Sequence, residues 1–357
     1  MYRKLIAFAV TSALMAPLAA QADAKPKVEF YGQLQVEVAK QDSKGVSATV
    51  VDDNKRGRLG VKASEDLGDG MKAIAQFEWQ VDTSDANATD GRRIGMVGLQ
   101  GSFGTVTSGS LMSPYKYTGG VKYDPFVTTF LEARSKGGMS GKIESAIAAK
   151  ATGMPDSKGS FGHHSFIHNA VSYSIKHKSL SFSIVYSPDQ QGDARGADGD
   201  YATALKYKHG SMESFIAATN DASNKMRATK VGGRYTIGKQ SIMGQYEKID
   251  AAGTNVGVLF LGYHYMLGKN MLVAQLGNTS IDQIGKDDIK YYALGVIHLF
   301  SKRSRIFTGY RNTDNGDANK DSAFSVCNRL DFLVYRSPPL YSVMGGGQLR
   351  VAGLYSV

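Results

Sequence analysis

The chain has 357 residues, and its 42 Lys and Arg against 32 Asp and Glu give a formal net charge of +10. The basic residues are scattered, with no run of five, which fits a charged lining better than a nucleic-acid patch. Cys327 is the only cysteine, so we expect a fold that is held together without disulfides. Only eight prolines are present, which argues against disorder.

The first 24 residues have the pattern of a secretory signal peptide. Arg3 and Lys4 precede an apolar run from Leu5 to Leu18, and small residues follow, so we predict cleavage after Ala22 or Ala24. The run is shorter than the ~20 residues that a membrane-spanning helix needs. No later apolar run reaches that length, so an exported protein of this kind is either soluble or a β-barrel.

The next residues alternate strictly between apolar and polar side chains. From Val28 to Val38 the even positions are apolar or glycine and the odd positions are polar, apart from Tyr31. The same period of two recurs around Leu59 to Ala63 and from Met71 to Val81. A period of two is the pattern of a β-strand with two different faces.

Strand length and connection length separate a membrane barrel from a soluble sandwich. Several of these strands reach the ~9–11 residues of a membrane strand. Short turns such as Leu67 to Gly70 alternate with long polar connections such as Val81 to Gly91, which is the rhythm of outer-membrane barrels.

Eleven further strands are predicted after two short ones between Arg92 and Gly109. They are His168 to Ile175, Leu180 to Tyr186, Tyr201 to Lys208, Met212 to Thr219, Thr229 to Thr236, Ser241 to Glu247, Gly257 to Met266, Asn270 to Gly277, Ile289 to Leu299, Arg305 to Arg311 and Ala323 to Phe332. We therefore predict an all-β fold, a sixteen-stranded antiparallel transmembrane β-barrel over residues 25–332.

The stretch Val97 to Gly109 resembles the general porin family of Gram-negative bacteria. The resemblance lies in Val-Gly-Leu at 97–99, Gly101, Phe-Gly-Thr-Val at 103–106 and Gly109. It implies an outer-membrane homotrimer without a cofactor, surrounded by lipid and lipopolysaccharide, whose water-filled channel passes small hydrophilic solutes and ions. It also implies that the third external loop, which follows this stretch, folds into the barrel and narrows the pore.

Charged side chains at such a constriction would set ion selectivity. The loop from Leu111 to Phe161 carries seven basic and four acidic residues, so we expect anion preference, although the family often opposes an acidic loop to a basic wall. The alternative for these side chains is a solvated surface loop. The predicted loop candidates are Lys116, Lys122, Asp124, Glu132, Arg134 and Lys136, and the predicted wall candidates are Arg58, Lys62, Lys72 and either Arg92 or Arg93.

The residues also raise other classes of function. His163, His164 and His168 with Ser165 could suggest a metal site or a hydrolase, but no carboxylate lies at a helpful local spacing, so we predict neither catalytic residues nor a metal site. An outer-membrane enzyme or adhesin, and a solute-specific channel, are the alternatives to a diffusion porin.

The end of the chain departs from the family pattern. The resemblance implies that Phe332 ends the last strand and closes the barrel against the first one. Residues 333–357 contain Pro338, Pro339 and three consecutive glycines, which do not continue a strand. We predict an atypical, loosely packed tail there; the alternative is that Gln348 to Val357 forms the last strand.

Overall fold

A computed structural model of the chain describes residues 26–54, 56–85, 91–134, 136–142, 160–161, 166–188, 199–222, 226–251, 253–282, 287–315 and 320–336. The predicted signal peptide, His163, His164 and residues 337–357 lie outside the described residues.

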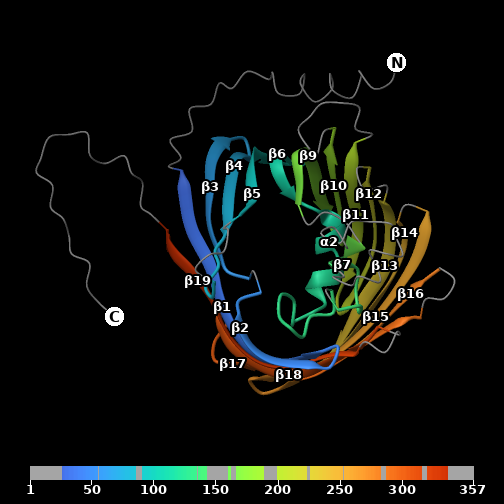
Figure 1. Cartoon of the computed structure of the whole chain (residues 1–357). Coiled ribbons are helices and arrows are strands. Elements are labelled where there is room, and N and C mark those ends of the chain that lie inside the picture. The colour runs from blue at the N-terminus through green and yellow to red at the C-terminus, as the bar shows by residue number, and fades with distance from the viewer. Residues whose placement is uncertain are drawn as a thin grey trace, which may run out of the picture.

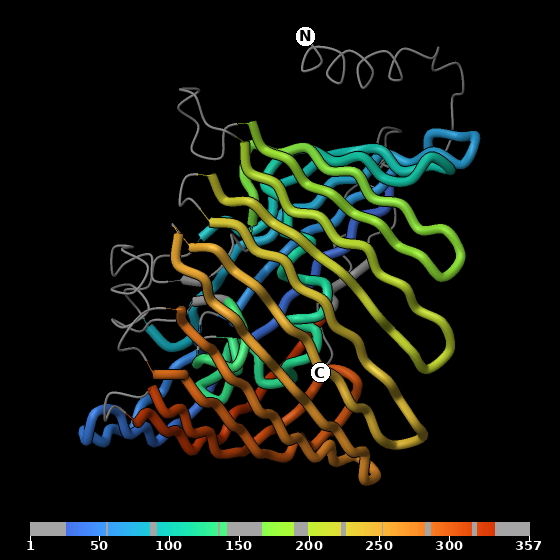
Figure 2. Tube along the Cα trace, turned by 90° about the vertical axis from the view of Figure 1, so that its right-hand side faces the viewer, coloured from blue at the N-terminus to red at the C-terminus, as the bar shows by residue number. Residues whose placement is uncertain are grey.

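The described chain forms one closed antiparallel barrel, as predicted (Figure 1). Each strand pairs with its neighbour in the chain, and the last strand returns to pair with the first. Figure 2 shows the strands running obliquely around the wall. The strands are β1 (Lys27–Ser43), β2 (Val46–Asp52), β3 (Arg58–Gly68), β4 (Met71–Gln80), β5 (Arg92–Gly101), β6 (Gly104–Met112), β9 (Phe166–His177), β10 (Leu180–Ser187), β11 (Asp200–His209), β12 (Met212–Asp221), β13 (Met226–Ile237), β14 (Gln240–Ala251), β15 (Thr254–Leu267), β16 (Asn270–Ile281), β17 (Ile289–Leu299), β18 (Ser304–Asp314) and β19 (Lys320–Arg336).

Seventeen strand segments make sixteen positions in the wall because β2 and β3 share one position. The half of β1 from Glu37 to Ser43 pairs with β2, and the half from Lys27 to Gln33 pairs with β3. Residues 53–57 interrupt the strand between them. Sequence reasoning missed β2, and the sixteen-stranded barrel that it predicted is confirmed.

The two faces of the wall have an inverted burial pattern. On β1 the apolar Leu34 and Val38 are 38% and 48% exposed, whereas the polar Gln35 and Glu37 are almost completely buried. A protein that faces water on its outside would bury the apolar set, so this alternation is typical of a barrel whose outer face lies against lipid. Among the described residues, no helix is long and apolar enough to cross a membrane.

The last strand runs further than the sequence predicts. Phe332 pairs with Gly32, and β19 then continues to Arg336, which pairs with Glu29. The first strand begins at Lys27, so Glu29, Phe30 and Tyr31 still offer backbone partners beyond the level of Phe332. The expected end of the strand at Phe332 is therefore four residues short.

The segment after β6 leaves the wall and makes contacts with distant strands. It contains α2 (Pro114–Tyr117) and η1 (Gly120–Lys122), and a small sheet joins β7 (Gly141–Lys142) to β8 (Ser160–Phe161). Figure 1 shows this segment within the ring of strands. Its buried Phe126 and Leu131 belong to a hydrophobic cluster with wall residues that include Phe307 and Tyr291.

Barrel closure gives a first prediction, at Gly32 on β1. A Cβ atom there would overlap with the Phe332 ring and lie 2.8 Å from the carbonyl oxygen of Arg58. We expect Gly32→Ala to lower the free energy of unfolding by about 1–3 kcal/mol, because overpacking forces the neighbouring strands apart. Urea unfolding in detergent, followed by the fluorescence of the single tryptophan, Trp79, would measure this.

The matched control is Gly91→Ala, since a Cβ atom at Gly91 meets nothing within 4 Å. Equal stabilities of the Gly32 and Gly91 variants would contradict the packing of Phe332 over Gly32.

Candidate functional site

Two buried carboxylates on different parts of the wall hold the segment after β6. Glu247 on β14 accepts hydrogen bonds from the Tyr115 hydroxyl (2.8 Å) and from the backbone N–H (3.1 Å) and hydroxyl of Ser140. Glu37 on β1 accepts the backbone N–H of Phe130 at 3.0 Å, while Arg311 on β18 donates from Nε to the Phe130 carbonyl at 2.7 Å. These contacts join residues up to 181 positions apart in the chain, so they fix the segment against strands from both ends of the sequence.

The carboxylates of the segment itself are turned away from solvent. Asp124 is 2% exposed and accepts hydrogen bonds from the N–H groups of Phe126 (2.9 Å) and Ala133 (2.8 Å) and from Gln275 Nε2 (2.9 Å) on β16. Burial raises the pKa of Asp124 to about 6. Asp124 therefore braces the turn and docks it onto the wall.

Glu132 has a comparable role. It is 5% exposed; its Oε2 accepts the backbone N–H of Thr128 at 2.6 Å and lies 3.4 Å from Arg134 Nη2. Both acidic residues among the predicted loop candidates, Asp124 and Glu132, are thus buried and hydrogen-bonded.

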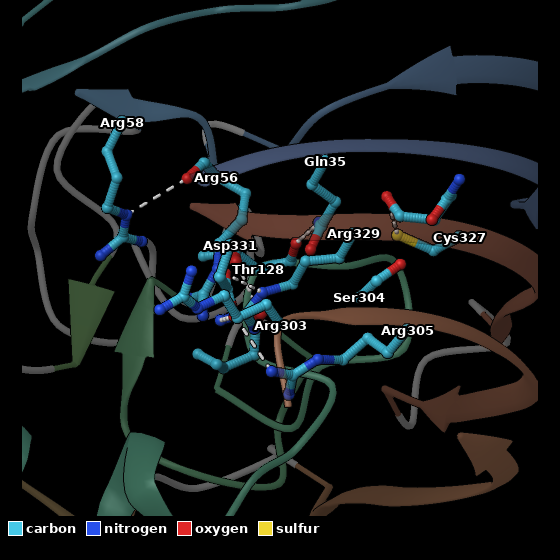
Figure 3. Close-up of polar contacts among 12 residues, drawn as sticks. Gln35, Arg56, Arg58, Thr128, Arg303, Ser304, Arg305, Cys327, Arg329 and Asp331 are labelled. Carbon is cyan, nitrogen blue, oxygen red and sulfur yellow. Dashed lines mark hydrogen bonds and ion pairs between the residues drawn. The ribbon is translucent and has the colours of Figure 1, made fainter. Parts of the chain in front are cut away.

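Arginines gather on the part of the wall formed by β3 to β5 and β18 to β19. Figure 3 shows Arg56, Arg305 and Arg329 near Asp331, and Arg58 further away beside Arg56. Asp331 Oδ1 lies 3.0 Å from Arg329 Nε, and its Oδ2 lies 3.0 Å from Arg305 Nη2. Cations therefore outnumber the carboxylate that bridges them.

A second carboxylate, Glu78 on β4, pairs with the neighbouring arginines. Its Oε1 lies 2.7 Å from Arg93 Nε and 3.9 Å from Arg58 Nη1, and its Oε2 accepts the hydroxyl of Tyr31 at 2.8 Å. The contact with Arg58 is long, so the main ion pair of Glu78 is with Arg93.

Arg56, between β2 and β3, makes no ion pair with any described residue, and its Nε has no hydrogen-bond partner there. Burial, and then repulsion from Arg329 and Arg58, lower the pKa of Arg56 well below its ordinary value, while Asp331 opposes them. A negative charge that comes near a buried guanidinium stabilises its charged form, so this position attracts anions.

Two lysines of the segment lie near the same arginines, and Arg134 of the segment lies near one of them, Lys116. Burial, followed by Arg134 and Arg93, lowers the pKa of Lys116 well below its ordinary value. Burial, followed by Arg56 and Lys206, lowers the pKa of Lys122. We call the following set the basic cluster: Arg56, Arg58, Arg93, Arg305, Arg329, Lys116, Lys122 and Arg134.

The comparisons with known proteins agree with this geometry. The profile of the Gram-negative porin family matches residues 9–318. The chain belongs to the Gram-negative porin family. The predicted resemblance is confirmed, and so is the predicted location in the outer membrane.

The similar sequences are those of major outer membrane proteins. The porin is 35% identical over 109 residues to the major outer membrane protein P.IB of Neisseria gonorrhoeae, covering 29% of this chain and 31% of that protein. It is 35% identical over 133 residues to the major outer membrane protein P.IA of Neisseria meningitidis serogroup C, covering 32% and 33%. The matches thus span about a third of the length of these relatives.

Solved structures share the fold over most of the chain. An anion-selective porin from Comamonas acidovorans has a TM-score of 0.68 at 19% identity, covering 86% of this chain and all of that one. The outer membrane protein OmpT of Vibrio cholerae, in a trimer form, has a TM-score of 0.62 at 14% identity and covers 86% and 100%. At these identities the likeness concerns the fold.

The structure brings five of the predicted site residues together. Arg58, Arg93, Lys116, Lys122 and Arg134 belong to the basic cluster. Between the two candidates that sequence left open, Arg93 faces Glu78, whereas Arg92 is exposed and makes no ion pair with a described residue.

The other predicted residues lie elsewhere. Lys136 pairs with Asp321 on β19 at 3.1 Å. Lys62 on β3 and Lys72 on β4 are exposed, and Lys62 Nζ lies 5.0 Å from the centre of the Tyr31 ring. Asp124 and Glu132 are buried, as described above.

Sequence reasoning missed three residues of the cluster, Arg56, Arg305 and Arg329. Arg329 alternates with Cys327 and Asp331 on the polar face of β19, which was a usable signal. Arg56 lies in an irregular segment, where alternation predicts no direction. His168 hydrogen-bonds Ser110 Oγ at 2.7 Å, and the described residues hold no group of three potential metal ligands.

The environment of Asp124 gives a prediction on pH. In the folded state its pKa is about 6 against an ordinary 3.8, so between those two pH values the folded protein binds more protons than the unfolded one. Stability from this group therefore falls as pH rises from about 4 to about 6. Relative to Asp124→Asn, the free energy of unfolding of the wild type should fall by about 1–3 kcal/mol over that interval.

Urea unfolding of both proteins at several pH values would measure this difference. Asp69→Asn, at the exposed turn between β3 and β4, is the control and should keep the wild-type pH dependence. Parallel curves for the wild type and Asp124→Asn would show that the buried carboxyl does not titrate in this window.

Proposed function

We propose that the porin is a passive diffusion channel that prefers anions, with a constriction between the wall arginines of the basic cluster and the segment from Leu111 to Lys136. The observation that carries this proposal is the imbalance of the cluster: Arg56 has no ion-pair partner among the described residues, and Lys122 of the segment adds a further cation near it. Rings of like charge at a narrow aqueous passage select ions of the opposite sign.

The placement of the carboxylates supports the same sign. Asp124 and Glu132 are buried and hydrogen-bonded within the segment. The surface of the segment therefore exposes neither of these carboxylates to the arginines. The similar porin from Comamonas acidovorans is anion-selective, which agrees with this inference.

The assembly and surroundings follow from the family. We propose a homotrimer, as in the trimer form of the similar Vibrio cholerae protein, with outer-membrane lipid and lipopolysaccharide around its apolar outer face. Small hydrophilic solutes and small anions are the proposed cargo. A solute-specific channel is the alternative, and it would require saturable conductance for one solute.

Ion selectivity tests the proposal directly. In a planar bilayer under a KCl gradient, we expect a reversal potential of the sign that indicates chloride preference. The double variant Arg56→Gln and Arg58→Gln should lower the chloride-to-potassium permeability ratio several-fold, because it removes two of the less well-paired charges of the cluster. Higher salt should weaken the preference, since the screening length is only about 8 Å at physiological ionic strength.

The matched control for these arginines is Lys62→Gln with Lys72→Gln, which removes the same charge from exposed positions outside the cluster. We expect that variant to keep the wild-type ratio. Cation preference of the wild type would overturn the proposal.

Channel width tests the position of the segment. Deleting the eight residues 124–131 should raise the single-channel conductance, because this part of the chain fills space between the walls. The control deletes the eight residues 189–196, in the connection between β10 and β11. Unchanged conductance of the first deletion, in a barrel that still assembles, would place the segment outside the conducting path.

A further inference from the structure

A recess of about 450 Å³ lies in the wall formed by β6, β9, β10 and β11, next to Thr118 of the segment. Its lining includes Thr105, Ser174, Ser181 and Ser183 together with Lys176 and Lys206. Leu180 and Tyr186 on β10 do not line the recess, and both are exposed on the outer face. Ser181 and Ser183 have the opposite parity along this strand, so these hydroxyls and the ammonium groups beside them belong to the inner face.

The strand register arranges these side chains in two rows. In the first row Thr105 pairs with Ser174, Ser174 with Ser183, and Ser183 with Ala204. The small side chain of Ala204 leaves room beside the three hydroxyls. In the second row Ser181 pairs with Lys176 on one side and with Lys206 on the other, so the two lysines stand about 10 Å apart at their Cα atoms.

None of these groups is satisfied within the described protein. In the part of the chain that the structure describes, the side chains of Thr105, Ser174, Ser181 and Ser183 make no hydrogen bond, and neither Lys176 nor Lys206 makes an ion pair. By contrast, Thr107 and Ser172, one step along the same strands, bond to each other at 2.6 Å. The recess therefore presents donors and positive charge that only a bound molecule or water can use.

A third lysine faces the same region. Lys206 and Lys122 repel each other strongly enough to contribute to the lowered pKa of Lys122, so an anion near both would relieve that repulsion. Because Lys122 belongs to the basic cluster, the recess adjoins the cluster on the side of the short turns at 178–179 and 210–211.

We propose that this recess is a binding subsite for the phosphate group of a small phosphate monoester. Lysine is a common phosphate ligand, which it binds as a point charge; the recess has two lysines and several hydroxyl donors in its lining. A phosphate monoester carries nearly two negative charges at pH 7, which matches two flanking lysines. The volume exceeds that of a bare phosphate and lies within the range of ligand sites, so the ester portion fits as well.

The inference rests on the proposed anion channel, because the ligand reaches the recess through the conducting path. Glucose 6-phosphate, glucose and gluconate serve as probes at constant KCl and pH 7.5, added to single channels in a planar bilayer. Glucose 6-phosphate should reduce the conductance with saturation and add current noise, whereas glucose and the monoanionic gluconate should not.

The variants locate the subsite. Lys176→Gln with Lys206→Gln should raise the half-blocking concentration of glucose 6-phosphate about tenfold or more, the size expected for losing charged hydrogen-bond partners. Ser181→Ala with Ser183→Ala should raise it as well, and these small changes leave the strands intact. The matched control is Lys208→Gln, two residues beyond Lys206 on the same strand and outside the lining, which should bind as the wild type does.

The outcomes separate the two proposals. Cation preference of the wild type would overturn the anion channel. Anion preference without block by glucose 6-phosphate, with equal block by gluconate, or with unchanged block of the double lysine variant, would overturn the subsite alone. Each variant is first checked for the heat-modifiable gel mobility of a folded barrel.

Discussion

The ladder between β1 and β19 is the constraint on which the rest of the structure depends. It pairs Glu29 with Arg336 at one end and Ser43 with Asp321 at the other, and it leaves the wall without a free edge. In lipid an unpaired backbone group has no water to bond, so only a closed sheet is stable there. Closure also fixes which side chains point inward, because a slip of one residue would move every side chain to the other face.

With the wall closed, the inner face must supply partners for the segment that follows β6. Glu37 and Glu247 do so from β1 and β14, where each buried carboxylate accepts several hydrogen bonds at once. Burying a charge is unfavourable unless its hydrogen bonds are complete. The segment and the wall therefore depend on each other: the segment completes the shell of each carboxylate, and each carboxylate fixes one part of the segment.

How far sequence reasoning reached depends on whether a feature is local. The alternation on β1 predicted both faces correctly, because a period of two is a property of the strand itself. It failed at Arg92 and Arg93 for a physical reason: the ladder between β4 and β5 has an irregularity there, with Ile94 opposite Glu78 but Arg92 opposite Trp79. Such a bulge resets the alternation, so only the structure identifies Arg93 as the partner of Glu78.

The anchors of the segment could not be read from the sequence, because they join residues such as Tyr115 and Glu247 across 132 positions. The contacts of the segment also bear on whether its carboxylates oppose the basic wall, as they often do in this family. A loop with more lysines than carboxylates does not oppose the basic wall by composition, and Asp124 and Glu132 are occupied in hydrogen bonds of the segment. The field between segment and wall therefore depends on where the fold places each charge, as well as on the count of charges along the chain.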